Sequence, residues 1–290
     1  MWSKGLILRA AAVPLLAASI RAADGPYVSS SASAIWQDKI TEAPPNDGII
    51  GALTLEGSTS LTWIHSVDFS TILSCGLCST VDVCTRFSGL DSLALGPQLT
   101  LKHKLGLGPY APSLSLGLEG NAVGFSDSER SRIEGAVVAA YSQRFGDSLQ
   151  LVVDARGGSY DARDVVFCGN YVSMSGTINW DIDDTWRLRL VGGWRSGDVV
   201  SNYTSYDTAQ GWVPYDFGAF NNPGAWHEVK TFGTPFVAWR VDARTGFYGF
   251  GVSPAIGPHT SLSLQVVTYN TKGYDRYVDN VVTASFVHRF

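Results

Sequence analysis

Residues 277–290 read YVDNVVTASFVHRF, and the alternation within them decides the fold. The even positions are mostly apolar, and they include Val278, Val282, Ala284, Phe286 and Phe290. The odd positions are mostly polar, and they include Asp279, Thr283, Ser285 and Arg289. Because successive side chains of a β-strand point to opposite faces, this segment is predicted to be a strand with one apolar and one polar face.

The same period of two recurs along the rest of the chain. Leu114, Leu116 and Leu118, for example, alternate with Ser115 and Glu119. Turn residues separate the alternating segments, which indicates an antiparallel arrangement. Twelve strands are predicted, over approximately 26–36, 49–62, 70–82, 92–104, 112–125, 131–144, 148–160, 170–181, 185–197, 242–256, 260–272 and 276–290.

The composition decides between a soluble and a membrane-embedded β-protein. Hydrophobic residues make up 45% of the chain and charged residues only 16%, whereas soluble domains are about a quarter charged. After Asp24 no apolar run approaches the roughly 18 residues that a transmembrane helix needs. A closed barrel pairs every backbone N–H and C=O, which lipid cannot do. We therefore expect an all-β chain forming a single transmembrane antiparallel β-barrel of about twelve strands, with a soluble exported sandwich as the alternative.

The first residues are typical of an export signal. Lys4 and Arg9 give a positive start, residues 10–18 are apolar, and Ala22 and Ala23 are small residues before Asp24. We expect residues 1–23 to be a signal peptide and residues 24–290 to be the barrel domain, located in a bacterial outer membrane.

The connector lengths give an independent check on the topology. The predicted connectors 63–69, 105–111, 145–147, 182–184 and 257–259 are all short. The connectors on the other side include 37–48, 83–91, 161–169 and the long, aromatic-rich 198–241. Short periplasmic turns and longer external loops are typical of outer-membrane barrels.

Several short stretches resemble one group of proteins. They are RFSGLD at 86–91, LGLGPYAP at 105–112, QRFG at 143–146 and RSGDVVS at 195–201. The chain is similar to a largely uncharacterised, Gram-negative family of outer-membrane β-barrels with about twelve strands. The resemblance implies a barrel and export, and it carries over no substrate, cofactor or catalytic residue. The four cysteines depart from the pattern of the group.

The last strand also resembles the signal that outer-membrane barrels present to their assembly machinery. Phe286 and Phe290 would carry this signal, although His288 stands where a large apolar residue is usual. The expected partners are thus the assembly machinery, outer-membrane lipid and lipopolysaccharide.

A set of charged residues falls on the predicted polar faces. Those expected to line the lumen are Glu56, Lys102, Glu119, Glu134, Asp154, Arg156, Arg187 and Arg189. Lys102 is expected near Glu119, and Glu134 near Asp154 or Arg156. Two interpretations stay open, because buried charges need partners: a cross-strand ionic network that fills the barrel, or a pore lining that selects small solutes.

Cys75, Cys78, Cys84 and Cys168 are the cysteines. In an oxidising compartment the Cys75-x-x-Cys78 spacing favours a structural disulfide over redox chemistry. The possible pairs are Cys84–Cys168, Cys75–Cys78 and Cys78–Cys84, and free thiols remain an alternative. No histidine lies near them in sequence, so no metal is expected.

Function is less determined than fold. The net charge of −5 argues against nucleic acid as a partner, because the sequence has no basic stripe to neutralise phosphates. We expect a narrow porin-like channel for small solutes, without a cofactor. One alternative is a sealed barrel with a structural or surface-binding role through residues 198–241. An outer-leaflet lipid-modifying enzyme ranks last, because only His227 of five histidines is placed outside and no G-x-S-x-G occurs.

Overall fold

The computed structural model describes residues 26–42, 50–204, 226–229, 231–232, 236–257, 259–273 and 276–289. The predicted signal peptide and the terminal Phe290 lie outside the described residues. So does most of the predicted 198–241 loop.

The described residues form twelve long strands and one short one. The long strands are β1 (Pro26–Gln37), β2 (Ala52–Ser66), β3 (Thr71–Cys84), β4 (Ser92–Lys104), β5 (Ser113–Phe125), β6 (Arg132–Phe145), β7 (Leu149–Ala162), β8 (Gly169–Asp181), β9 (Trp186–Thr204), β11 (Phe236–Gly257), β12 (Thr260–Lys272) and β13 (Arg276–Arg289). The short strand β10 (Trp226–Val229) pairs only with the start of β11. Three single 3-10 turns, η2 (Ser88–Leu90), η3 (Ser128–Arg130) and η4 (Val165–Phe167), lie in the connectors.

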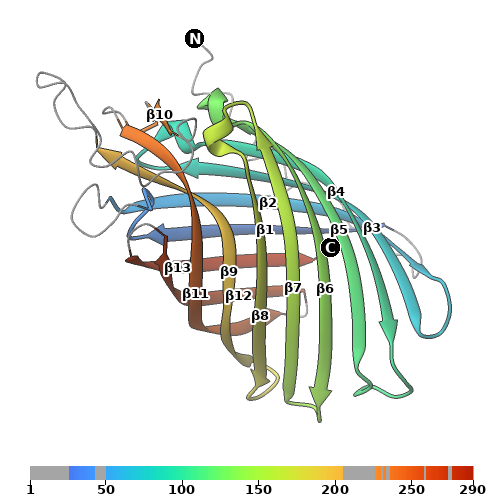
Figure 1. Ribbon diagram of the computed structural model, residues 1–290. Coiled ribbons are helices and arrows are strands. Elements are labelled where there is room, and N and C mark those ends of the chain that lie inside the picture. Colours follow the sequence, from blue (N-terminus) through green and yellow to red (C-terminus); the bar gives the residue numbers. More distant parts are fainter. Residues whose placement is uncertain are drawn as a thin grey trace, which may run out of the picture.

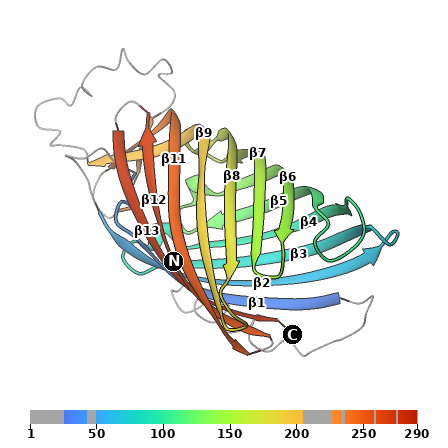
Figure 2. The ribbon, with the colours of Figure 1, turned by 90° about the horizontal axis from the view of Figure 1, so that it is seen from below.

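The twelve long strands close into an antiparallel barrel. Each strand pairs with its neighbour in sequence, and β1 pairs with β13, with Ser33 opposite Ser285. β9 pairs with β11 along its whole length, with Arg195 opposite Thr245. Figures 1 and 2 show these two closing contacts, with β1 beside β13 and β9 beside β11. Closure leaves no long strand with an unpaired edge, so the predicted fold class is confirmed.

The outer face of the barrel is apolar. Leucines of β4 and β5 that alternate with polar residues lie outward, and Leu116 is 53% exposed. Tryptophans and tyrosines share this face, among them Trp63, Trp180, Trp194 and Tyr248. An apolar band with aromatic residues is what lipid requires of a barrel. Among the described residues, no helix is long and apolar enough to cross a membrane.

The main correction to the predicted strands concerns the long loop. β9 continues to Thr204 and β11 begins at Phe236, so both enter the segment 198–241 that was predicted to be a loop. The reason is tertiary, because Asp198 lies opposite Asp242 and the ladder then continues to Thr204 opposite Phe236. β11 also resolves an unclear face, because Phe247 lines an internal cavity while Tyr248 is exposed on the outer face.

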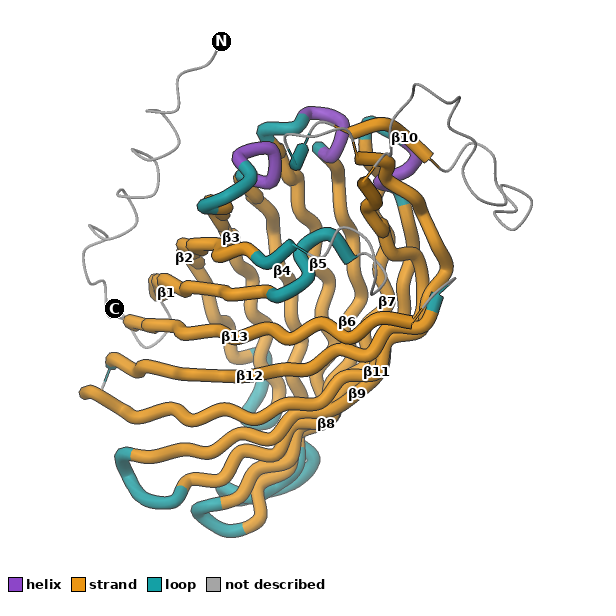
Figure 3. Tube along the Cα trace, turned by 90° about the vertical axis from the view of Figure 1, so that its left-hand side faces the viewer, coloured by secondary structure: helices purple, strands orange, loops and turns teal. Residues whose placement is uncertain are grey.

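The two ends of the barrel differ, as Figure 3 shows. We call one the turn end, because it carries the tight connections 67–70, 105–112, 146–148 and 182–185. We call the other the loop end, because it carries η2, η3, η4 and the segment 38–42 after β1.

Candidate functional site

The polar face of the strands forms the wall of the lumen. Arg156 and Glu119 line one internal cavity, and Arg187 and Arg189 line another. The other predicted residues lie on the same face: Glu134, Asp154 and Lys102 line cavities, and Glu56 lies opposite Ser33 and Asp82.

The ionic pairs differ from those expected. Arg156 on β7 pairs with Glu119 on β5. The side chain reaches across the intervening strand β6, where the small Ala136 lies opposite Glu119. Lys102 lies opposite Ser115, so the expected contact with Glu119 is wrong. Glu134 pairs with Arg132 on its own strand at 2.6 Å, and it lines the same cavity as Arg156.

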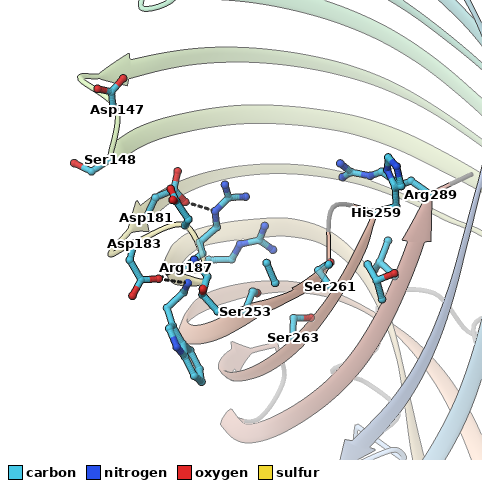
Figure 4. A pocket seen from close by; sticks show the side chains of 18 residues that line it. Asp147, Ser148, Asp181, Asp183, Arg187, Ser253, His259, Ser261, Ser263 and Arg289 are labelled. Carbon is cyan, nitrogen blue, oxygen red and sulfur yellow. Dashed lines mark hydrogen bonds and ion pairs between the residues drawn. The ribbon is translucent and has the colours of Figure 1, made fainter.

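A wide vestibule opens at the turn end (Figure 4). Its volume is about 720 Å³, and Arg187, Arg189 and Arg289 line it together with Asp181. Asp181 accepts from Arg187 Nε at 2.5 Å and from Arg144 Nη2 at 3.2 Å. Arg144 belongs to a second turn-end cavity of about 360 Å³ that also contains Lys102 and Lys104. The sequence pattern singled out neither Asp181 nor Arg144.

A second hollow, the central chamber, lies between the vestibule and the loop end. Its volume is about 450 Å³ and inward side chains of β7 to β13 line it. Tyr171 holds two arginines there: Arg156 Nε donates to its hydroxyl at 3.0 Å, and the Arg195 guanidinium lies 4.5 Å from its ring centroid. The Tyr171 ring lies over Gly158, its cross-strand partner, and it can do so because glycine has no side chain that would clash with the ring. Sequence reasoning missed Arg195 and Tyr171.

An apolar cluster, which we call the loop-end cap, packs across the described part of the loop end. It consists of Ala52, Cys84, Phe87, Val166, Phe167, Phe232 and Ala238, with Ile40, Ile50, Leu90, Ala162 and Val200 packed against them. Cys84 lies on β3 and Val200 on β9, which are six strands apart in either direction around the ring. The cap therefore spans the diameter of the barrel.

Arg130 is the polar centre of the cap. Its Nε donates to Thr231 Oγ1 and its Nη2 to Asn202 Oδ1, both at 3.1 Å. Its guanidinium lies 4.4 Å from the ring centroid of Phe167. Burial lowers the pKa of Arg130 to about 10, and the neighbouring Asp127 opposes that shift, so the side chain stays charged at neutral pH.

The segment 38–42 folds inward from β1 and reaches β9, which lies four strands away around the ring. Thr41 is fully buried, and its carbonyl accepts from the backbone N–H of Asn202 on β9 at 2.9 Å. The Glu42 carbonyl accepts from Ser201 Oγ at 2.6 Å, and Glu42 has a left-handed φ of 53°. Burial raises the pKa of the Glu42 carboxyl, and Arg195 and Arg130 oppose the shift.

All four cysteines are free thiols. Cys75 and Cys78 are three residues apart on β3, so their side chains lie on opposite faces of the wall and cannot bond. Cys84 is buried in the cap, and Cys168 Sγ lies 3.3 Å from Asp161 Oδ1. The structure thus contains none of the disulfides that the sequence left open.

The histidines place no catalytic group at the loop end within the described side chains. His65, His103, His259 and His288 lie near the turn end. His227 falls in β10, whose side chains are outside the described part of the chain. Within the described ranges, no group of three or more His, Cys, Asp or Glu side chains is arranged to hold a metal ion.

Comparison with known proteins places the fold. No family model matches the chain, and no curated protein sequence matches it. Among solved structures, it is similar to an outer-membrane channel from Pseudomonas putida F1, with a TM-score of 0.56 at 10% identity over 94% of this chain and 100% of that one. The NanC porin and the KdgM porin follow with TM-scores of 0.48 and 0.46 at 9% identity; they cover 89% and 90% of this chain and 98% and 99% of their own. At such identities the likeness shows the fold alone: the chain is a closed twelve-stranded β-barrel of the outer-membrane type.

Proposed function

We propose that the protein is a narrow, porin-like channel for small solutes in a bacterial outer membrane. The observation that carries this proposal is the hollowed, charged interior, with a vestibule of about 720 Å³ and a central chamber of about 450 Å³ in one lumen. Ligand and solute sites are concave hollows with a few well-placed polar groups. The similarly folded Pseudomonas putida protein is itself an outer-membrane channel, which supports the same direction.

The ends of the barrel set the direction of the proposed path. Short turns of outer-membrane barrels face the periplasm and longer connectors face outward. The turn-end vestibule would then open to the periplasm, and the loop-end cap would lie at the external mouth. A solute would pass only where the cap loosens, so we expect small conductance with frequent closures.

The lumen carries both positive and negative side chains, which suits small polar solutes of either charge. Arg187 and Arg189 lie at the turn end together with Asp181, and Glu119 neutralises Arg156 in the middle. Cation and anion preference therefore depends on the arginines that remain in excess at the vestibule.

Single-channel recording of the refolded protein in planar bilayers tests the proposal. We expect discrete steps whose reversal potential in a salt gradient moves toward cation preference when Arg187 and Arg189 are both replaced by Glu. Heat-modifiable migration on gels verifies that each variant is folded. Folded protein without any conductance would contradict the channel.

A sealed barrel is the second candidate, and the loop-end cap favours it. An apolar cluster that spans the diameter is what a structural or surface-binding barrel needs at its outer face. A failure of both the wild type and cap-loosened variants to conduct would support this reading over the channel. The outward apolar face would contact lipid and lipopolysaccharide in both cases, and β13 with Phe286 would engage the assembly machinery.

A further inference from the structure

The central chamber is built from two neighbouring rows of inward side chains. Hydrogen-bonded register places the first row across six strands, from β7 to β13: Asp154, Ser175, Gly193, Phe247, Tyr269 and Asp279. The second row, one inward position closer to the loop end, is Arg156, Ser173, Arg195, Thr245, Thr271 and Tyr277. Inward positions along a strand are about 6.7 Å apart. An acidic row and a basic row thus lie side by side.

The basic row contains one donor that the protein does not use. Arg156 is engaged by Glu119 and by the Tyr171 hydroxyl. The Arg195 guanidinium lies over the Tyr171 ring, and its Nε is buried without a hydrogen-bond partner. Arg195 as a whole is only half-buried and lines the chamber, so a carboxylate there can reach its guanidinium. A guanidinium fixed in this way is suited to a carboxylate.

The acidic row offers the opposite charge in Asp154, which lies two strands from Arg195 and one inward position closer to the turn end. Asp154 accepts from Ser175 Oγ at 2.6 Å, which leaves further lone pairs on its carboxylate. Asp279, at the other end of the row, is already bonded to Gln37 Nε2 and to the Lys39 backbone N–H. Asp154 is therefore the carboxylate best placed to receive a ligand cation.

An aromatic surface lies beside these charges, on the strands β11 and β12 that follow Arg195 around the wall. Phe247 and Tyr269 are cross-strand partners with ring centroids 5.7 Å apart. The Phe247 ring fits over Gly193, which has no side chain in its way. Phe247 and Tyr269 both line the chamber, so their rings offer an apolar surface to a flat or cyclic body.

We infer that the central chamber binds a small zwitterion with an apolar ring, of the aromatic α-amino acid class, with its carboxylate on Arg195 and its ammonium on Asp154. The Phe247–Tyr269 surface receives the ring. Glu42, which faces Arg195 from the inward segment, is the acidic competitor for the carboxylate position. The inference rests on the proposed function, because it assigns a solute class to the path through the lumen.

Titration calorimetry of the full refolded chain in detergent tests the site with three probes. They are L-phenylalanine, 3-phenylpropionate, which lacks the ammonium group, and 2-phenylethylamine, which lacks the carboxylate. L-phenylalanine is expected to bind at least roughly tenfold more tightly than either analogue, because each analogue leaves one charged hydrogen bond unmade.

The variants separate the two charges. Arg195→Gln should weaken the binding of L-phenylalanine and 3-phenylpropionate roughly tenfold and leave that of 2-phenylethylamine unchanged. Asp154→Asn should weaken the binding of L-phenylalanine and 2-phenylethylamine roughly tenfold and leave that of 3-phenylpropionate unchanged. The matched control Arg86→Gln removes an exposed arginine that does not line the chamber, and it should leave the affinity for all three probes unchanged. Equal affinity for the three probes, no binding to folded protein, or the same loss in the Arg86→Gln control would overturn the site.

Calorimetry and single-channel recording together distinguish a failure of the site from a failure of the channel. Probe binding with this pattern in a protein that never conducts would leave the site standing and remove the channel. Conductance without probe binding would remove the site and leave the channel.

Discussion

The two ends of the lumen are built on opposite principles. At the loop end, apolar side chains from connectors on both sides of the ring meet over the diameter, and Phe167 is only 2% exposed. At the turn end, charged side chains line a wide hollow, and the Arg187–Asp181 and Arg144–Asp181 pairs are partly exposed to solvent. Burial of apolar area stabilises far more than exposed ion pairs do. In the proposed channel, the loop end would therefore be the part that must open, and the turn end would adjust what approaches it.

The largest effect is expected from removing the centre of the cap. Phe167→Ala should destabilise the closed loop end by about 3–5 kcal/mol, because it leaves a cavity among Phe87, Val166 and Phe232. Hydrogen exchange of the amides in 163–168 measures this as lost protection. The matched control is Val165→Ala in the same turn, because Val165 is 53% exposed and its truncation should change stability by no more than about 0.5 kcal/mol. Equal protection in the two variants would show that the cluster does not hold the cap.

A smaller effect is expected at the polar centre of the cap. Arg130→Lys keeps the charge but loses the forked contacts to Thr231 and Asn202, so the cap should lose about 2 kcal/mol. Protease nicking of the loop end in folded protein measures the change. Arg86→Lys is the comparison, because Arg86 is exposed, with Nη1 donating to the Gly51 carbonyl at 3.2 Å and the guanidinium 5.2 Å from the Phe87 ring centroid. Equal nicking of the two variants would rule out a special role for Arg130.

The inward segment should respond to pH in a defined direction. Because burial raises the pKa of Glu42, the closed loop end takes up its proton more readily than the open one. This contribution to stability is fully present below the ordinary value of 4.5 and is lost as pH rises through the raised pKa. Arg195, Arg130 and Tyr277 face this carboxyl, and Asp38, on the same segment, pairs with Asp279.

Glu42→Gln isolates this contribution from the rest. The variant should keep the cap protected to higher pH and flatten the pH dependence of exchange in 38–42. Asp38 contributes at lower pH and with the opposite sign. Burial raises the pKa of Asp38, but hydrogen bonds with Asp279 and Asn280 outweigh burial and leave that pKa below 3.8. Its contribution to stability is therefore lost as pH falls. An unchanged pH profile in Glu42→Gln would refute the assignment to Glu42.

The smallest effect concerns the cysteines. Four free thiols predict that reducing agent leaves the unfolding transition unchanged and that unreduced, denatured protein takes up four maleimides. In folded protein, a water-soluble reagent should modify Cys78, which lies on the inner face, and spare Cys75, which faces the lipid side. Fewer than four reactive thiols by mass spectrometry would mean that a disulfide forms.

The comparison of the two ends also shows what the sequence could predict. Strict alternation located β4, β5 and β6 within a residue or two, because lipid on one side and the lumen on the other enforce it there. The same reasoning did not predict the part of β9 after Gly197. Beyond the lipid band the pairing with β11 no longer needs an apolar outer face, so no alternation marks this part in the sequence. The cap was not foreseen, because Phe87 and Phe167 stand in irregular connectors where no period marks them.

The site was predicted residue by residue but not as an arrangement. Alternation placed Glu119, Arg156, Arg187 and Arg189 on the inner face. It did not predict that Arg156 reaches over a small residue of β6 to Glu119, because such a contact depends on side-chain length and not on strand neighbours. The alternating acidic and basic rows of the chamber also depend on register across six strands, which one sequence does not display.

Single-channel recording of Phe167→Ala beside Val165→Ala and the wild type tests the central claim most directly. If the lumen is a solute path that the loop-end cap closes, Phe167→Ala should show larger and longer openings, while Val165→Ala should match the wild type. Identical currents in all three folded proteins, or no current in any of them, would contradict a path closed by the cap.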